Sequence, residues 1–130
     1  MRLADIRDYV NSLGIADVVY MGKLEDKKQR SVGVYKSSHS YGLYRTAIGG
    51  PSLESYGIYY VTLLIHWNRS PRDTEDASVR LFEALRATRE EEINNDKIKF
   101  IQPLYELQNV GTDDDGICEM VIEAAVFYER

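Results

Sequence analysis

Residues 59–85 read YYVTLLIHWNRSPRDTEDASVRLFEAL. Residues 59–67 alternate between two largely apolar sets, and this pattern predicts a central β-strand with both faces covered. The two sets are Tyr59, Val61, Leu63, Ile65 and Trp67 on one face, and Tyr60, Thr62, Leu64 and His66 on the other. We therefore expect this strand to lie at the centre of the core.

A helix should follow this strand. Ser70 stands at a possible N-cap, Pro71 at the first helical position and Asp73 in the first turn. Residues with helical spacing then predict a face that lies on the sheet, namely Ala77, Leu81, Phe82, Ala84, Leu85 and Thr88. We expect the helix to fade in the polar run 89–96, where Glu90, Glu91 and Glu92 would form a solvated helix end.

The N-terminal part predicts a short helix and two strands. Apolar residues recur with helical spacing at Leu3, Ile6, Val10 and Leu13, and Gly14 can end that helix. The runs 18–21 and 31–35 are β-branched or aromatic and are separated by a charged segment. This arrangement predicts a hairpin with a solvated tip.

The C-terminal third also predicts a hairpin. Residues 98–110 form one extended arm, residues 111–116 a polar turn, and residues 117–128 the second arm. Pro103 interrupts the first arm, so we expect an edge strand or a bulge there. On the second arm, the glutamates at 119, 123 and 129 mark the wetter face.

These elements together predict an α+β fold in a single domain over residues 1–130. We expect one mixed or antiparallel sheet of about five strands with two helices packed against it, in the order α-β-β-β-α-β-β. A long loop or arm at about 36–56 is rich in Ser, Gly and Tyr and is our first candidate for a partner-binding element. The candidate protein-interface residues are Tyr41, Tyr44, Arg45 and Tyr56 in this loop, and Asp113, Asp114 and Asp115 in the polar turn.

The composition restricts the classes of function. The net charge of −5 gives no positive field to collect a phosphate backbone, so nucleic acid is not an expected direct partner. The lone Cys118 has no intramolecular disulfide partner and no apolar run opens the chain, so we expect an intracellular, reducing origin. The longest apolar stretch, residues 58–67, is too short for a membrane span.

No catalytic, metal or cofactor site is predicted. Cys118 alternates with apolar residues on a strand and has the pattern of a small buried side chain, while His66 lies within a strand and His39 in the loop. Residues 113–116 lack the alternating oxygen ligands of a calcium loop. Gly49 and Gly50 are not followed by the lysine and hydroxyl of a phosphate-binding loop. We expect no enzymatic activity.

Two stretches carry a family resemblance. One is KKQRSVGVYK at 27–36 followed by the strand and helix of residues 59–85, and the other is the ending IQPLYELQNVGTDDDGICEMVIEAAVFYER at 101–130. With the opening helix, they resemble the minor capsid or tail-completion proteins of long-tailed bacteriophages, a group similar to the tail terminators. The resemblance spans most of the chain and includes the order of the elements.

The resemblance implies a structural, non-enzymatic virion protein with a small α+β fold. It implies a ring, commonly a hexamer, that caps the tail tube and joins it to the head connector, after assembly in the host bacterial cytoplasm. The partners would be other copies of the chain and the tail-tube and connector proteins. An acidic ring lumen, lined by residues 90–92 or 113–115, would repel DNA.

Two other classes of function stay open at this point. A sheet covered by helices can frame a pocket, so a small-molecule-binding or regulatory module is the alternative. A hydrolase that pairs Cys118 with a histidine is the third, and it requires an activity that Cys118→Ala destroys.

Overall fold

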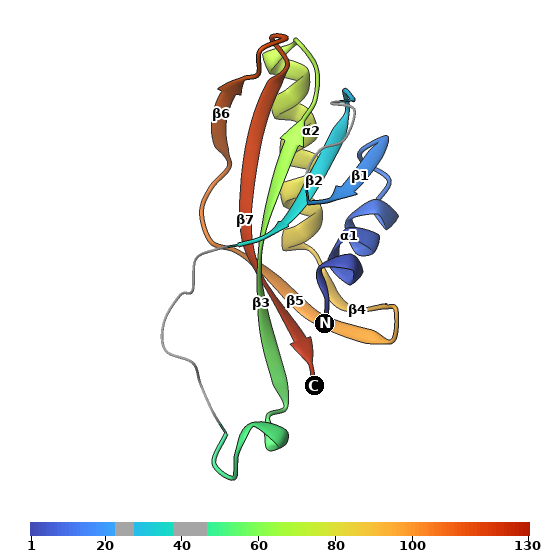
Figure 1. Cartoon of the computed structure of the whole chain (residues 1–130), viewed down its shortest axis with the longest axis vertical. Coiled ribbons are helices and arrows are strands. Elements are labelled where there is room, and N and C mark those ends of the chain that lie inside the picture. The colour runs from blue at the N-terminus through green and yellow to red at the C-terminus, as the bar shows by residue number, and fades with distance from the viewer. Residues whose placement is uncertain (23–27, 38–46) are drawn as a thin grey trace.

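The computed structural model describes residues 1–22, 28–37 and 47–130, and it shows an α+β fold (Figure 1). Within these ranges, two α-helices, one 3-10 turn and seven strands follow one another. They are α1 (Leu3–Ser12), β1 (Val18–Met21), β2 (Ser31–Lys36), η1 (Pro51–Leu53), β3 (Tyr56–His66), α2 (Pro71–Arg86), β4 (Arg89–Ile93), β5 (Asp96–Pro103), β6 (Gln108–Thr112) and β7 (Cys118–Glu129).

The strands form one mixed sheet in the order β1-β2-β3-β7-β5-β4, with β6 also paired to β7. The central position predicted for β3 is confirmed, because it pairs with β2 on one side and with β7 on the other. Residues 124–128 of β7 pair with β5, whereas residues 118–121 pair with β6. The predicted arm 98–110 is therefore two strands in succession along one edge of β7, and β5 ends at Pro103.

The predicted count of about five strands is wrong, since the sheet has seven. One reason is the segment 89–96, which is not a fading helix end. It forms the β4–β5 hairpin, in which Asn94 and Asn95 adopt φ values of 49° and 69°. Asparagine tolerates this left-handed conformation, which a tight hairpin turn needs at both central positions. Glu90, Glu91 and Glu92 are thus strand residues.

The hairpin predicted for residues 18–35 is also wrong, because β1 and β2 pair in parallel. Both strands run in the same direction, with Val19 opposite Val32. The backbone N–H of Asp17 donates to the carbonyl oxygen of Arg30 at 2.8 Å, which places the start of β1 beside the start of β2.

Both helices begin where the sequence predicts and α1 ends before Gly14 as expected, whereas α2 ends at Arg86, before the polar run in which it was expected to fade. The Ser70 hydroxyl accepts the backbone N–H of Asp73 at 3.2 Å, and Pro71 opens α2. At α1, the helix ends at Ser12 and Gly14 follows with a φ of 69°. These caps satisfy backbone groups at the helix ends and set where each helix begins or ends.

Both helices pack on one face of the sheet, and the hydrophobic core lies between them and that face (Figure 1). The core includes Ile6 and Val10 from α1, Leu81 and Leu85 from α2, and the inward set of β3 and β7, namely Val61, Leu63, Ile65, Ile122, Ala124 and Val126. On the opposite face, the β3 side chains Ile58, Tyr60, Thr62 and Leu64 are only half-buried. The prediction that β3 is covered on both faces is therefore wrong, and the sheet has an outer face.

Gly57 shows how tightly β3 and β7 pack near their ends. It lies directly opposite Tyr128, and a Cβ atom at Gly57 would overlap the Tyr128 ring and lie 2.6 Å from Nε of Arg130. The Tyr128 ring is buried and cannot swing away freely. The glycine is required here for space, because the Tyr128 ring covers it.

Gly57→Ala should therefore lower the free energy of unfolding by about 1–3 kcal/mol, the usual cost of overpacking. Urea denaturation of the single variant, of Tyr128→Ala and of the double variant measures this cost and its origin. In the Tyr128→Ala background the added methyl has room, so its cost should largely vanish. Equal costs in the two backgrounds would contradict this account.

Candidate interface site

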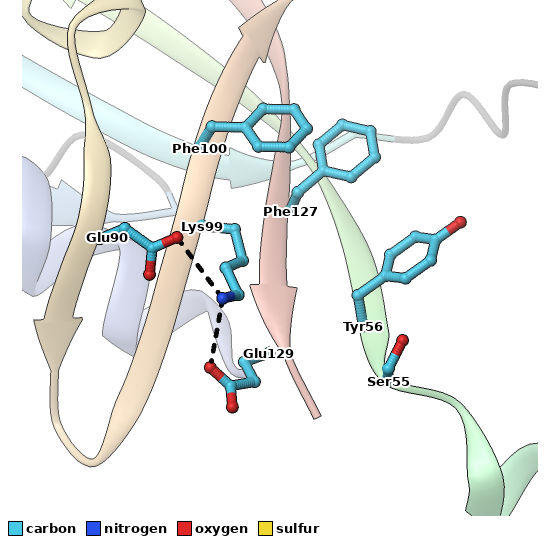
Figure 2. Close-up of a pocket in the computed structure, with 7 residues that line it drawn as sticks. All are labelled: Ser55, Tyr56, Glu90, Lys99, Phe100, Phe127 and Glu129. Carbon is cyan, nitrogen blue, oxygen red and sulfur yellow. Dashed lines mark hydrogen bonds and ion pairs between the residues drawn. The ribbon is translucent and has the colours of Figure 1, made fainter.

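Three aromatic side chains gather on the outer face of the sheet, and we call them the aromatic patch: Tyr56 of β3, Phe127 of β7 and Phe100 of β5 (Figure 2). The ring centroids of Phe100 and Phe127 are 4.4 Å apart, and those of Tyr56 and Phe127 are 6.2 Å apart. Tyr56 and Phe100 are 42% and 43% exposed. Large exposed rings held in a stack are typical of protein-binding surfaces.

Charged residues flank the aromatic patch and neutralise one another. Nζ of Lys99 lies 3.4 Å from Oε1 of Glu90 and 3.6 Å from Oε2 of Glu129 (Figure 2). Nζ of Lys97 lies 3.0 Å from the other Glu90 oxygen. The hydrogen bond between Lys97 and Glu90 lowers the pKa of Glu90 and raises the pKa of Lys97. Both groups therefore stay charged around neutral pH.

Local irregularities in β4 and β5 place these charges beside the aromatic patch. Glu90 adopts a φ of 51°, which is unusual for a non-glycine residue, and the β4 pairing passes from Arg89 to Glu91 without it. The register between β5 and β7 shifts between Ile98 and Phe100, which marks a bulge at that point. A bulge redirects side chains and is common near functional surfaces.

The aromatic patch and the charged side chains line a shallow hollow of about 640 Å³. Its lining consists of Ser55, Tyr56, Glu90, Lys99, Phe100, Phe127 and Glu129. Among the described residues, no group of His, Cys, Asp and Glu side chains is arranged to hold a metal ion. The hollow combines stacked aromatic rings with paired charges, and such a surface suits an uncharged, apolar segment of a protein.

A projecting segment starts beside the hollow, and we call residues 47–54 the arm. In Figure 1 it lies at the lower end of the molecule, beyond the sheet. Its η1 turn has no buried residue, Ile48 is fully exposed and Leu53 is 66% exposed. The arm is therefore a part of the predicted loop that presents apolar side chains to solvent.

The base of the arm is tied to the end of β7. The backbone N–H of Arg130 donates to the Ser55 carbonyl oxygen at 3.1 Å, and the Arg130 guanidinium lies 3.7 Å from the Glu54 carboxylate. The same guanidinium donates to the Tyr128 hydroxyl at 3.1 Å. These contacts fix the direction in which the arm leaves the sheet.

The predicted interface residues do not form one site. Tyr56 belongs to the aromatic patch. Asp113, Asp114 and Asp115 lie in the turn between β6 and β7, at the opposite end of β7 from Phe127 (Figure 1). Tyr41, Tyr44 and Arg45 lie outside the described residues. The interface role of all seven stays a prediction.

Asp113 has an internal partner that the sequence did not indicate. Its Oδ2 atom lies 2.7 Å from Nε2 of the buried His66, whose Nδ1 lies 3.0 Å from the Lys28 carbonyl oxygen. Its Oδ1 atom accepts the backbone N–H groups of Asp115 and Ile117, both at 2.9 Å. The hydrogen bond with His66, followed by that from Ile117, lowers the pKa of Asp113. We call the His66–Asp113 pair the latch.

Both ring nitrogens of His66 lie within hydrogen-bond distance of an oxygen atom, the Lys28 carbonyl at Nδ1 and the Asp113 carboxylate at Nε2. This arrangement joins the β6–β7 turn to the segment before β2. It also gives His66 a structural partner other than the thiol of Cys118, which is buried on β7. The structure thus gives no support to a nucleophile built from these two side chains.

Sequence reasoning missed Phe100, Phe127 and Lys99. Phe127 lies on the face of the last strand that its glutamates mark as wetter. Phe100 lies in the predicted strand 98–110, where the interruption at Pro103 left the two faces unassigned. An aromatic residue among glutamates on the outer face was the available signal.

One comparison with known proteins finds a match. A family model described as bacteriophage tail terminator protein matches residues 9–130. No curated protein matches the chain. Within the described parts of the chain, neither helix is both long and apolar enough to cross a membrane.

Proposed function

Because the chain belongs to the bacteriophage tail terminator family, we propose that it assembles as a ring that caps the tail tube and joins it to the head connector. Its role is structural tail completion in the virion. The ring, its stoichiometry of six and the junction with the connector are the parts that need testing. The chain acts in this account as one domain without enzymatic activity.

The observation that supports assembly most strongly is the exposed aromatic patch on the outer face. Single exposed apolar side chains are common, but Tyr56 and Phe100 are both more than two-fifths exposed and stack with Phe127 in one patch. Covering such rings with a neighbouring protein removes apolar area from water and favours association. Other copies of the chain and the tail-tube and connector proteins are the proposed partners.

The acidic residues have a second place in this proposal. Glu91 and Glu92 on β4 and Asp114 and Asp115 in the β6–β7 turn are all exposed. If either set lines the lumen of the ring, like charges would keep the passing DNA from adhering. Asp113 is unsuited to this role because its carboxylate is engaged in the latch.

The hollow beside the aromatic patch favours one alternative, a small-molecule-binding module. Its volume of about 640 Å³ falls within the usual range for ligand sites. In that case the chain would stay monomeric at every concentration, and a metabolite would raise its melting temperature in a thermal-shift screen.

Light scattering over a series of concentrations tests the proposal. We expect a discrete ring mass, in solution or after mixing with tail tubes, that is independent of any small molecule. Electron micrographs of the same samples should show rings. A monomer under both conditions, stabilised by a metabolite, would favour the module instead.

A further inference from the structure

We propose that the arm of one copy docks into the hollow of the next, so that the subunits join head to tail. This inference rests on the proposed ring and names the two surfaces that would form its subunit contact. The arm contributes Ile48 and Leu53, and the hollow contributes Phe100, Phe127 and Tyr56. A contact between two different surfaces of identical copies generates a closed ring when the rotation permits.

The arm is built to present its apolar side chains outward. Gly49 and Gly50 both have a φ of 107°, and the Gly50 N–H donates to the Ala47 carbonyl oxygen at 3.0 Å. A Cβ atom on Gly49 would lie 2.6 Å from Cδ1 of Leu53, so Leu53 lies against the turn itself. This preorganised turn loses little conformational entropy on binding.

Among the described residues of the same copy, none buries the side chains of Ile48 and Leu53. Ile48 is fully exposed and Leu53 is 66% exposed. The lining of the hollow begins at Ser55, so the arm tip of the same copy does not line it. Since the arm projects beyond the sheet in Figure 1, a second copy is the occupant that we infer.

The charges of the two surfaces also match. Residues 47–53 read AIGGPSL and carry no charge. The one nearby carboxylate, Glu54, is paired with Arg130 at the base of the arm. In the hollow, Lys99 is paired with both Glu90 and Glu129, so the occupant need not bring a counter-charge. An uncharged apolar tip thus meets a surface whose charges are already satisfied.

Two single-surface variants and their mixture test this inference. The arm variant is Ile48→Asp with Leu53→Asp, and the hollow variant is Phe100→Asp. At a concentration where wild type is fully assembled, each variant alone should sediment as a monomer, which corresponds to a roughly thirtyfold or greater loss of affinity for a hot-spot contact. An equal mixture should give a dimer and nothing larger, because one intact arm meets one intact hollow.

Further variants keep the test decisive. Val79 on α2 is an apolar residue with nearly the same exposed fraction as Phe100, 41% against 43%. The Val79→Asp variant should assemble like wild type. If Phe100→Asp does not fold, Ser55→Phe fills the hollow without removing any packed group and should also give a monomer. Circular dichroism verifies the fold of every variant.

The outcomes separate the inference from the proposed function. If wild type forms no assembly, alone or on tail tubes, the proposed ring fails. If wild type assembles and the arm variant assembles equally well, only the arm-and-hollow contact fails. Two monomeric variants that show no dimer when mixed would also overturn the head-to-tail contact.

Discussion

Replacing residues 38–53 with a short Gly/Ser linker should abolish ring formation while leaving the fold intact. The arm contributes no buried residue through η1, and the core formed by the described residues lies between the two helices and the sheet face on which they pack. Removing the arm tip should therefore cost the monomer little. Removing the apolar arm tip deprives the proposed subunit contact of one of its two surfaces.

The linker must span the gap that the fold leaves. The Ser37 N–H donates to the Tyr60 carbonyl oxygen, so the linker runs from this point to Ser55 along β3. At about 3.3 Å per residue, roughly six Gly/Ser residues suffice. Circular dichroism and the melting temperature should match wild type, while light scattering should report a monomer.

A second variant scrambles the segment that the linker replaces. It keeps the length and composition of residues 38–53 but separates the two glycines from Pro51, so that the turn at Gly49 and Gly50 is lost. We expect this variant to fail in assembly as well, because the ordered turn positions Ile48 and Leu53. Rings formed by the linker variant would show that the arm has no part in assembly.

The second large effect concerns the latch. His66→Ala should lower the free energy of unfolding by about 3 kcal/mol, because it empties a buried site and removes two hydrogen bonds. Urea denaturation at neutral pH measures the change. A second variant, Asp113→Asn, removes the carboxylate of the latch. Its control is Asp114→Asn, which removes the same charge from the exposed neighbouring position and should leave the denaturation midpoint unchanged.

The latch should also make stability depend on acidity. The hydrogen bond with His66 holds the pKa of Asp113 below its usual value, so the stabilisation is present above the ordinary carboxyl pKa of about 3.9. It is lost as the pH falls through the lowered pKa of the folded state. The difference in stability between wild type and Asp113→Asn should therefore be present at pH 7 and shrink below about pH 4. A constant difference across this range would contradict the latch.

The sequence predicted the features that depend on local pattern. The N-cap at Ser70, the helix end near Gly14 and the central position of β3 all follow from short-range chemistry and periodicity. The recognition of the family is confirmed as well. The predicted α+β class with two helices holds for the same reason.

The errors arose where pairing or assembly decides the outcome. The parallel pairing of β1 with β2 was missed because the relative direction of two short strands is not specified by any local sequence pattern. The β4–β5 hairpin depends on the turn at Asn94 and Asn95. The polar sequence around these residues was interpreted as the end of a helix. The outer-face side chains of β3 are largely apolar, and this pattern predicted that they are covered within the fold. The structure leaves them only half-buried.

The candidate site was only partly predictable for a related reason. Tyr56 was identified from its loop, but Phe100 and Phe127 become neighbours only through the pairing of β5 with β7. Glu90 meets Lys97 and Lys99 only after the hairpin forms. A site made across strands needs the register, and the register is a property of the whole sheet.

The central claim is that copies of this chain assemble on the end of a tail tube. Its most direct test is electron microscopy of purified tail tubes of the same phage incubated with the protein. We predict a ring at one end of each tube with wild type, and bare ends with the Ile48→Asp, Leu53→Asp variant. Tube ends that stay bare with folded wild-type protein would contradict the account.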